Sequence, residues 1–398
     1  MSFLQGFTLF TALFFLMRNK IDFLLLFFCS LILYSWQIVY GIIWVPPYTF
    51  EVSSQSQWIV SIVIGVLIFF TIANDSLSNK LNELTYNKDR ESDEVTLFLI
   101  FTIISYLSSF YAIYKGWGNI FSGKSDFLRS TGFSYYFITY FPASMSLLFF
   151  VISRRYKLAF IALVPLLFYL IVGYRASIVT TIIFAIFIYM YNQKIFTLET
   201  LKPILLVGFM FIFFAVYKFS YIFLQSGDVS SLADVIKFFT ELPEKDPRFD
   251  GLIEYLIFYM FSAEFGQTSS NLSLTSSMDL SKYYSFPRTL VGSIPFFDTI
   301  SGIGEEESRF STVIEAHANP GFSYGLGSSI WGEMYQGGGY IGVFLFAFVI
   351  IFLIFSYNIS FLRSKERFTL FSYFIAFLSF YIHRNDFVLV IANIKNII

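Results

Sequence analysis

The stretch Gly339–Tyr357, GYIGVFLFAFVIIFLIFSY, contains no charged residue and is dominated by aliphatic and aromatic side chains. A helix that crosses the hydrocarbon core of a bilayer needs roughly 20 apolar residues, with about 17–25 the usual range. The stretch is therefore long and apolar enough to form a transmembrane helix. The whole chain has the same character: 56% of its 398 residues are hydrophobic and 13% are charged, whereas soluble proteins carry about 25% charged residues.

Further apolar runs of similar length precede and follow this stretch. They cover residues 2–17, 21–41, 57–73, 95–115, 133–152, 157–172, 176–191, 203–222, 368–383 and, as a shorter run, 386–398. We therefore expect an all-α polytopic membrane protein with about ten or eleven transmembrane helices. The first run resembles the apolar part of a signal peptide, but its basic residues follow it and no A-x-A cleavage site is present, so we interpret it as a retained span.

Basic residues in the short connections predict the orientation of these helices, because cytoplasmic loops carry an excess of Lys and Arg. One set of connections holds thirteen: Arg18, Lys20, Lys80, Lys88, Arg90, Arg154, Arg155, Lys157, Lys194, Lys202, Arg363, Lys365 and Arg367. The opposite set holds five: Lys115, Lys124, Arg129, Arg175 and Arg384. The first set is predicted to be cytoplasmic, which places the long segment 223–330 outside the cytoplasm.

The chain then divides into three parts. Residues 1–222 form an N-terminal transmembrane bundle of about eight spans, 223–330 form the long external loop, and 331–398 form the C-terminal transmembrane helices. The loop contains SLADVIKFF and GLIEYLIFYMFSAEF, whose apolar residues have helical spacing. We therefore expect a partly helical loop, with the second segment lying along the membrane interface.

Arginines at the outer ends of the spans are the first candidate site residues. They are Arg175 in GYR, Arg288 in FPRTL, Arg309 in SRFS and Arg384 in YIHRND. The guanidinium group carries a permanent charge and binds phosphate oxygens bidentately, so a group of external arginines could bind a lipid-linked phosphate. Each could equally be an arginine whose charged end reaches the interface for solvation alone.

The second candidate region runs from His317 to Gly342, HANPGFSYGLGSSIWGEMYQGGGYIG, and holds eight glycines. If the chain becomes helical after Ser328, then Ser329, Glu333 and Gln336 share one face. His317 and Glu333 are candidates to orient or deprotonate a substrate hydroxyl, although a histidine near an interface can also be a purely structural polar residue. The glycines have structural interpretations too: Gly338-x-x-x-Gly342 allows close helix contact, and Gly321, Gly325 and Gly327 allow tight turns.

The span pattern, the single long external loop, and NPGFSYGLGSSIWGEMYQGGGYIG after FPRTL resemble the bacterial O-antigen polymerases of the Wzy type. The GYR turn and the terminal HRND also resemble that family. The topology resemblance covers nearly the whole chain, and the motif resemblance covers about 173–175, 286–340 and 381–386.

This resemblance implies a metal-independent membrane glycosyltransferase without a cofactor, in lipopolysaccharide biosynthesis. It would act at the periplasmic face of the bacterial inner membrane on oligosaccharide repeat units linked to undecaprenyl diphosphate. The growing chain would join the non-reducing end of a new lipid-linked unit. Glu333 and His317 would act on the acceptor, the four arginines would bind the diphosphate, and Tyr324, Trp331 and Tyr335 could stack on sugars. Membrane lipids and a chain-length regulator protein would be further partners.

Two other functions remain open at this stage. A transporter or flippase of lipid-linked oligosaccharides would share the substrate, although spans nearly free of charge and the lack of a detectable inverted repeat argue against it. An O-antigen ligase would share the topology and the chemistry. The composition excludes a disulfide framework and a cysteine-based metal site, because Cys29 is the single cysteine, and no feature points to nucleic acid.

Overall fold

The computed structural model describes residues 2–45, 48–81, 91–119, 124–172, 176–191, 193–197, 199–206, 208, 265–280, 282–293, 310–317, 329–363, 369–384, 387 and 390. The chain forms two compact units. Unit 1 comprises Met1–Lys80, Arg248–Ile359 and Phe374–Ile398, and unit 2 comprises Leu81–Pro247 and Ser360–Tyr373. Residues 1–80 thus pack with the C-terminal part of the chain, whereas residues 81–247 form most of the other unit. The two units therefore do not correspond to the three parts expected from the sequence.

The predicted apolar runs form helices wherever the structure describes them. These helices are α1 (Phe3–Arg18), α2 (Phe23–Tyr40), α3 (Ser54–Leu81), α4 (Glu91–Gly116), α6 (Phe133–Ile152), α7 (Tyr156–Ile171), α8 (Ala176–Met190), α16 (Ile330–Arg363) and α17 (Thr369–Phe380). Among the described residues, five helices are long and apolar enough to cross a membrane: Phe23–Tyr40, Ser54–Ser78, Val95–Asn119, Tyr135–Ile152 and Ile330–Ile359. The protein is therefore an α-helical membrane protein. Most of the runs 203–222 and 386–398 lies outside the described residues.

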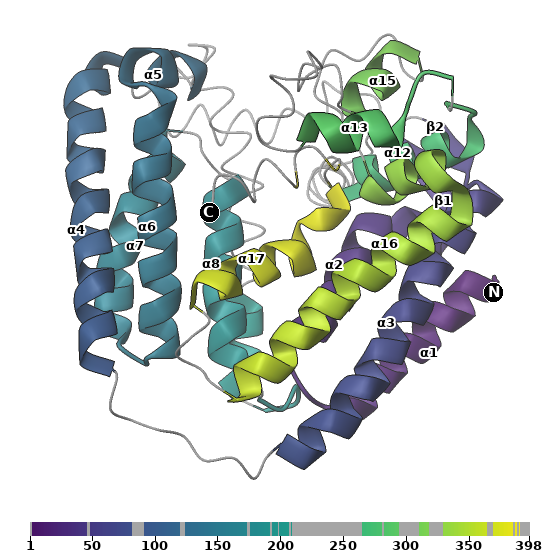
Figure 1. Ribbon diagram of the computed structural model, residues 1–398, viewed down its shortest axis with the longest axis horizontal. Coiled ribbons are helices and arrows are strands. Elements are labelled where there is room, and N and C mark those ends of the chain that lie inside the picture. The colour runs from purple at the N-terminus through teal and green to yellow at the C-terminus, as the bar shows by residue number, and fades with distance from the viewer. Residues whose placement is uncertain are drawn as a thin grey trace, which may run out of the picture. The chain divides into compact units, whose positions relative to one another are not determined.

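In unit 1, α3 and α16 lie side by side, as Figure 1 shows. The ring of Phe70 on α3 contacts the rings of Phe348, Phe352 and Phe355 on α16, with centroids 5.0, 6.0 and 5.4 Å apart. Aromatic pairs at such distances add to the free energy gained from apolar burial. This contact joins the N-terminal helices to the helix that carries the glycine-rich sequence.

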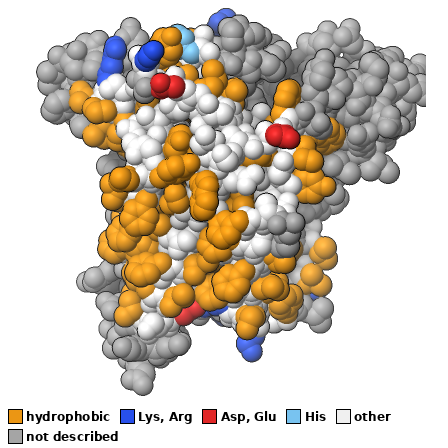
Figure 2. Space-filling model, turned by 90° about the vertical axis from the view of Figure 1, so that its right-hand side faces the viewer, with side chains coloured by type: hydrophobic (Ala, Val, Ile, Leu, Met, Phe, Trp, Pro, Cys, Tyr) orange, Lys and Arg blue, Asp and Glu red, His pale blue; other side chains and the backbone are white. Residues whose placement is uncertain are grey.

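The outer face of unit 1 is apolar along most of its length (Figure 2). Large hydrophobic side chains lie exposed on three helices: Phe10 on α1, Phe69 on α3, and Ile341 and Leu345 on α16. Charged side chains gather toward the two ends of the face shown in Figure 2. An exposed apolar surface of this extent fits lipid rather than water as the surrounding solvent.

One end of unit 1 is built from short elements that the apolar pattern did not predict. They are the hairpin of β1 (Ile42–Val45) and β2 (Tyr48–Glu51), α12 (Gln267–Ser277), α13 (Phe286–Ser293) and α15 (Phe310–His317). The strands pair antiparallel, with Ile42 opposite Glu51 and Val45 opposite Tyr48. The segments SLADVIKFF and GLIEYLIFYMFSAE lie outside the described residues.

Helix α12, QTSSNLSLTSS, is polar in sequence and yet buried. Ser53 at the start of α3 contacts it twice: its backbone N–H donates to Ser273 Oγ at 3.0 Å, and its hydroxyl lies 2.8 Å from Ser276 Oγ. Ser269 Oγ donates to the Tyr34 carbonyl oxygen of α2 at 2.9 Å. Hydrogen-bonded hydroxyls carry little desolvation penalty, so a serine-rich helix can form part of the core.

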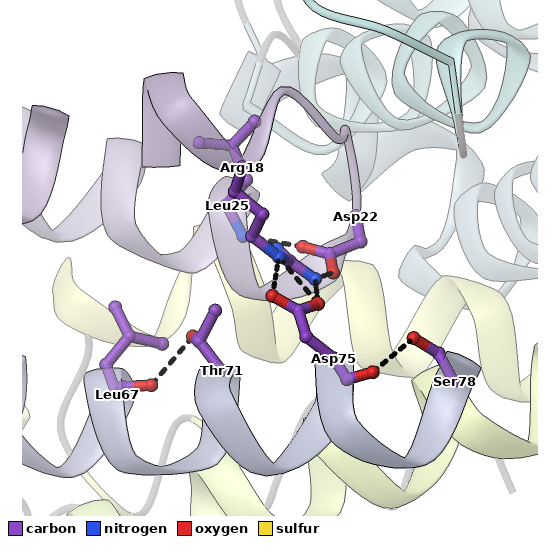
Figure 3. Close-up of polar contacts among 7 residues, drawn as sticks. All are labelled: Arg18, Asp22, Leu25, Leu67, Thr71, Asp75 and Ser78. Carbon is purple, nitrogen blue, oxygen red and sulfur yellow. Dashed lines mark hydrogen bonds and ion pairs between the residues drawn. The ribbon is translucent and has the colours of Figure 1, made fainter. Parts of the chain in front are cut away.

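A buried ion network holds the opposite end of unit 1 (Figure 3). Nη2 of Arg18, the last residue of α1, donates to Asp22 Oδ2 at 2.5 Å, and its Nε donates to both carboxylate oxygens of Asp75 on α3. Asp22 also caps α2 by accepting from Leu25 N. Burial lowers the pKa of Lys20 in the same connection, and the charge of Asp22 opposes that shift. One network thus joins α1, α2 and α3.

The two ends are separated by about the thickness of a membrane. Ser53 marks the α12 end of α3 and Asp75 marks the ion-network end. At about 1.5 Å per residue, the helix between them is about 33 Å long, and the hydrocarbon core of a bilayer is about 30 Å thick. The elements α12, α13 and α15 and the Arg18 network therefore fit opposite membrane surfaces.

Unit 2 contains α4, η1 (Trp117–Asn119), α5 (Lys124–Thr131), α6, α7 and α8. Its long helices pack through aromatic rings and isolated hydroxyls. Phe98 on α4 stacks on Phe149 of α6 with centroids 4.2 Å apart, and Ser146 Oγ donates to the Phe98 carbonyl oxygen at 2.9 Å. Between α6 and α8, Thr181 Oγ1 lies 3.2 Å from the hydroxyl of Ser144. Such hydroxyl contacts fix helix register in an apolar bundle.

Candidate active site

Glu333, in the first turn of α16, is a fully buried carboxylate in unit 1. The phenol of Tyr284 donates to its Oε1 at 2.6 Å, and the backbone N–H of Phe387 donates to its Oε2 at 2.6 Å. An acidic residue in the first turn also interacts favourably with the helix dipole. The carboxylate therefore has both oxygens held at a fixed position, at the mouth of a candidate membrane span.

Gln336 lies one turn further along the same face, as the sequence predicted. Its Nε2 donates to the carbonyl oxygens of Thr275 and Met278, at 2.5 and 2.8 Å, and its Oε1 accepts from Leu280 N at 3.1 Å. These three bonds hold the end of α12 and the chain that follows it against α16. Since Tyr284 comes shortly after Leu280, Gln336 also positions the phenol that binds Glu333.

Two glycines of the quoted region are required by the geometry of this site. A Cβ atom on Gly332 would lie 2.5 Å from Thr275 Oγ1, so only glycine lets α12 approach α16 this closely. Gly339 has φ 60° inside α16, a conformation that bends the helix and that glycine adopts readily. A Cβ atom on Gly338 would meet no described atom within 4 Å, so the helix contact allowed by Gly338-x-x-x-Gly342 stays a prediction. Close approaches also occur on either side of it: a Cβ atom on Gly337 would lie 2.7 Å from Phe286 Cβ, and one on Gly342 would lie 2.6 Å from the Met334 carbonyl oxygen.

His383 is a buried histidine that the sequence interpretation did not select. The indole Nε1 of Trp331 donates to its Nδ1 at 3.0 Å. Because an indole N–H can only donate, Nδ1 must accept, so the imidazole is neutral and carries its proton on Nε2. The sequence offered only a weak signal, because His383 ends an apolar run next to the more conspicuous Arg384.

The segment after α17 closes the site. It continues through η3 (Ile382–Arg384) to Phe387, whose N–H binds Glu333. The Phe387 ring packs edge-on against Phe286 of α13, with centroids 5.4 Å apart. Arg384 is half-buried on this segment. Three parts of the sequence that are far apart, 284–286, 331–337 and 383–387, therefore converge around Glu333.

His317 ends α15 and is exposed, and its ring stacks on Tyr283 with centroids 3.8 Å apart and planes 15° apart. Tyr283 is 57% exposed, whereas the next residue, Tyr284, is 6% exposed and binds Glu333. The side chains of these two neighbours therefore point in different directions. His317 therefore contacts the exposed Tyr283 at the surface, and Glu333 contacts the buried Tyr284 in the interior.

The remaining predicted site residues are placed as follows. Arg288 is exposed on α13, one turn beyond the segment that carries Tyr284. Tyr335 is half-buried on α16, and its ring lies 5.1 Å from that of Tyr340. Arg175, Arg309 and Tyr324 lie outside the described residues. The structure thus brings Glu333 and the Arg384 segment together and places Arg288 and His317 on neighbouring short helices.

Comparisons with protein-family models, curated proteins and solved structures give no match to this chain. Among the described residues, no group of three or more His, Cys, Asp and Glu side chains is arranged to hold a metal ion.

Proposed function

We propose that the protein is a membrane glycosyltransferase that polymerises oligosaccharide repeat units linked to undecaprenyl diphosphate, as an O-antigen polymerase. The observation that carries the proposal is the convergence of three segments around Glu333. The FPR and WGEMYQGGG sequences and the chain that follows His383 and Arg384 meet there. These sequences resemble that polymerase family, and about 100 residues of chain separate the first from the last. A shared structural role would also bring them together, so the proposal rests on their chemistry as well.

The chemistry requires a hydroxyl acceptor and a charged leaving group. The oxygen of the acceptor sugar forms a bond to the anomeric carbon of the growing chain. The bond between that carbon and the lipid diphosphate breaks, and its electron pair leaves with the diphosphate. The acceptor proton moves to Oε1 of Glu333. The acceptor hydroxyl reaches this oxygen by displacing the Tyr284 phenol. General-base catalysis of this kind contributes about 10²–10⁴-fold in rate.

Arginines supply the positive charge that the leaving diphosphate needs. Arg384 lies on the segment that also binds Glu333, and Arg288 is exposed on the adjacent α13. Arg309 and Arg175, which lie outside the described residues, stay candidates for the same role. The stacked Tyr283 and His317 offer a flat, exposed surface on which a sugar ring could pack, since aromatic faces bind the apolar faces of sugars.

The proposed location follows from the two ends of α3. The Arg18 network lies at the end whose connections are rich in Lys and Arg, which is the cytoplasmic end under the positive-inside rule. Glu333 lies with α12 and α13 at the other end of unit 1. We therefore assign the site to the periplasmic face of the bacterial inner membrane.

A deletion strain tests this function against its alternatives. Loss of a polymerase leaves lipopolysaccharide with single-unit caps, loss of a ligase leaves none, and loss of a flippase leaves repeat units on the cytoplasmic leaflet. Single-unit caps that regain full length with the wild-type chain support the proposal. Either of the other two patterns contradicts it.

A further inference from the structure

Unit 2 contains a groove that the proposed function does not use. Its volume is about 610 Å³, within the range of about 300–1,000 Å³ typical of ligand pockets. It lies where α6 ends, α7 begins and α8 ends, beside the short helical stretch 199–206. The lining residues are Val151, Tyr156, Ala185, Ile186, Tyr189, Glu199, Lys202, Pro203 and Leu206.

The interior of the groove is apolar. Val151, Ile186 and Leu206 supply aliphatic walls, and Ala185 leaves space because its side chain is a single methyl group. Tyr156 and Tyr189 lie at the surface, 50% and 42% exposed, with their rings edge-on and 6.0 Å apart. Tyrosines with an apolar ring and an exposed hydroxyl are typical of the membrane–water interface. The groove therefore fits a hydrocarbon chain that enters from the interface.

The surroundings of the groove are strongly basic. Lys202 lines it, and four exposed basic residues lie on the two chain segments that lead into it: Arg154, Arg155, Lys157 and Lys194. Glu199 is the one acidic residue between 151 and 206. These five basic residues and Glu199 together carry a net charge of +4. All five lie in connections that the sequence predicts to be cytoplasmic.

We propose that this groove binds one acyl chain of an anionic glycerophospholipid, with the lipid phosphate held by Lys202 and the neighbouring basic side chains. The apolar interior alone would accept any lipid, and the basic rim alone would attract any anion. Together they select a molecule with a hydrocarbon chain next to a phosphate, and basic pockets between membrane helices bind such headgroups. The bound lipid would fill the space between α7, α8 and the stretch 199–206.

The test uses the full-length protein, purified in mild detergent and offered dioleoyl phosphatidylglycerol or dioleoyl phosphatidylcholine at equal concentration. Native mass spectrometry counts the lipids retained per chain. We expect one phosphatidylglycerol to be retained in preference to phosphatidylcholine. Each basic side chain near an anionic headgroup contributes about fivefold in affinity, so Lys202→Glu should reduce that preference by more than tenfold.

Lys115→Glu is the matched control. Lys115 is an exposed lysine of the same unit at the C-terminal end of α4, where its ammonium group lies 6.0 Å from the ring of Tyr135 near the start of α6. It is thus at the opposite end of α6 from the groove. This variant should keep the wild-type preference. Equal retention of the two lipids by the wild type, or equal losses in the two variants, would overturn the proposal.

A second variant tests the apolar part of the groove. Ala185→Leu fills it and should lower retention of both lipids, while size-exclusion behaviour and helical content report whether the variant folds. A photoreactive side chain at Ile186 provides a measurement that does not depend on that variant. Crosslinks to lipid support the site, whereas crosslinks to another part of the chain would show that protein fills the groove and would refute the proposal.

Discussion

The phenol of Tyr284 donates a 2.6 Å hydrogen bond to Oε1 of Glu333, and both side chains are buried. The two residues are 49 positions apart, and the bond fixes the chain between α12 and α13 to the first turn of α16. A buried carboxylate that loses such a donor loses part of what offsets its desolvation. This contact is therefore both a structural link and, under our proposal, the position at which an acceptor hydroxyl binds.

Tyr284→Phe and Glu333→Gln should separate these two roles. Tyr284→Phe removes one donor and should lower the free energy of unfolding by about 1.5–3 kcal/mol, as expected for a hydrogen bond to a charged group. It leaves the base in place, so polymer should still form. Glu333→Gln keeps the shape and should abolish long chains. Glu51→Gln, which changes an exposed glutamate on β2, is the control and should change neither property. Polymer length and thermal unfolding of the same membrane preparations provide the measurements.

Substitutions of the arginines near the site should show whether their positive charge alone or also the geometry of the guanidinium group is needed. Arg288→Ala and Arg384→Ala should shorten or abolish the polymer, because the leaving diphosphate loses a cationic partner. Lysine at either position keeps the charge but loses the two-pronged contact, so it should restore activity only in part. An arginine that only reaches the interface would be replaced by lysine without loss. Ladder length at matched membrane abundance decides between these outcomes.

The Arg18 network should contribute strongly to stability. Arg18→Met leaves Asp22, whose side chain is 1% exposed, without its cation, and breaking a buried pair from one side costs about 3–5 kcal/mol. Lys20→Met removes a positive charge from the same connection without breaking these bonds and should cost far less. Thermal unfolding of the purified proteins in detergent compares them. Equal stability of the two variants would mean that the network is solvated in the native protein.

The orientation can be measured with introduced cysteines in a Cys29→Ser background. Lys282 is exposed after α12 and Lys194 is exposed after α8. We expect a membrane-impermeant maleimide to label Lys282→Cys in cells whose outer membrane alone is permeable. Lys194→Cys should react only after the inner membrane is opened. The reverse pattern would place Glu333 on the cytoplasmic side, where the proposed reaction does not occur.

The sequence predicted the long helices well because their signal is local. Apolar runs such as 133–152 and 157–172 coincide with α6 and α7 almost to the residue, since a membrane helix satisfies its own backbone hydrogen bonds and needs only apolar side chains. Helix α12 was missed for the complementary reason. Its hydroxyl groups look solvent-exposed in sequence, and only their bonds to Ser53 and Tyr34 allow burial.

The site was predicted in part. Glu333 and Gln336 were assigned to one face from their spacing alone, and the structure confirms this through their contacts with the chain at 275–284. The Trp331–His383 and Arg18–Asp75 contacts could not be predicted, because each joins residues more than 50 positions apart. Sequence spacing carries no information on such pairs until the helices are packed.

The most direct test of the central proposal is chain extension by the purified protein. The protein is placed in vesicles that contain the undecaprenyl-diphosphate-linked repeat unit, and the length of the lipid-linked glycan is measured with time. We predict covalent products of two or more units with the wild type and none with Glu333→Gln of equal stability. A product that stays one unit long with the wild type, or extension by Glu333→Gln at the wild-type rate, would contradict the assignment.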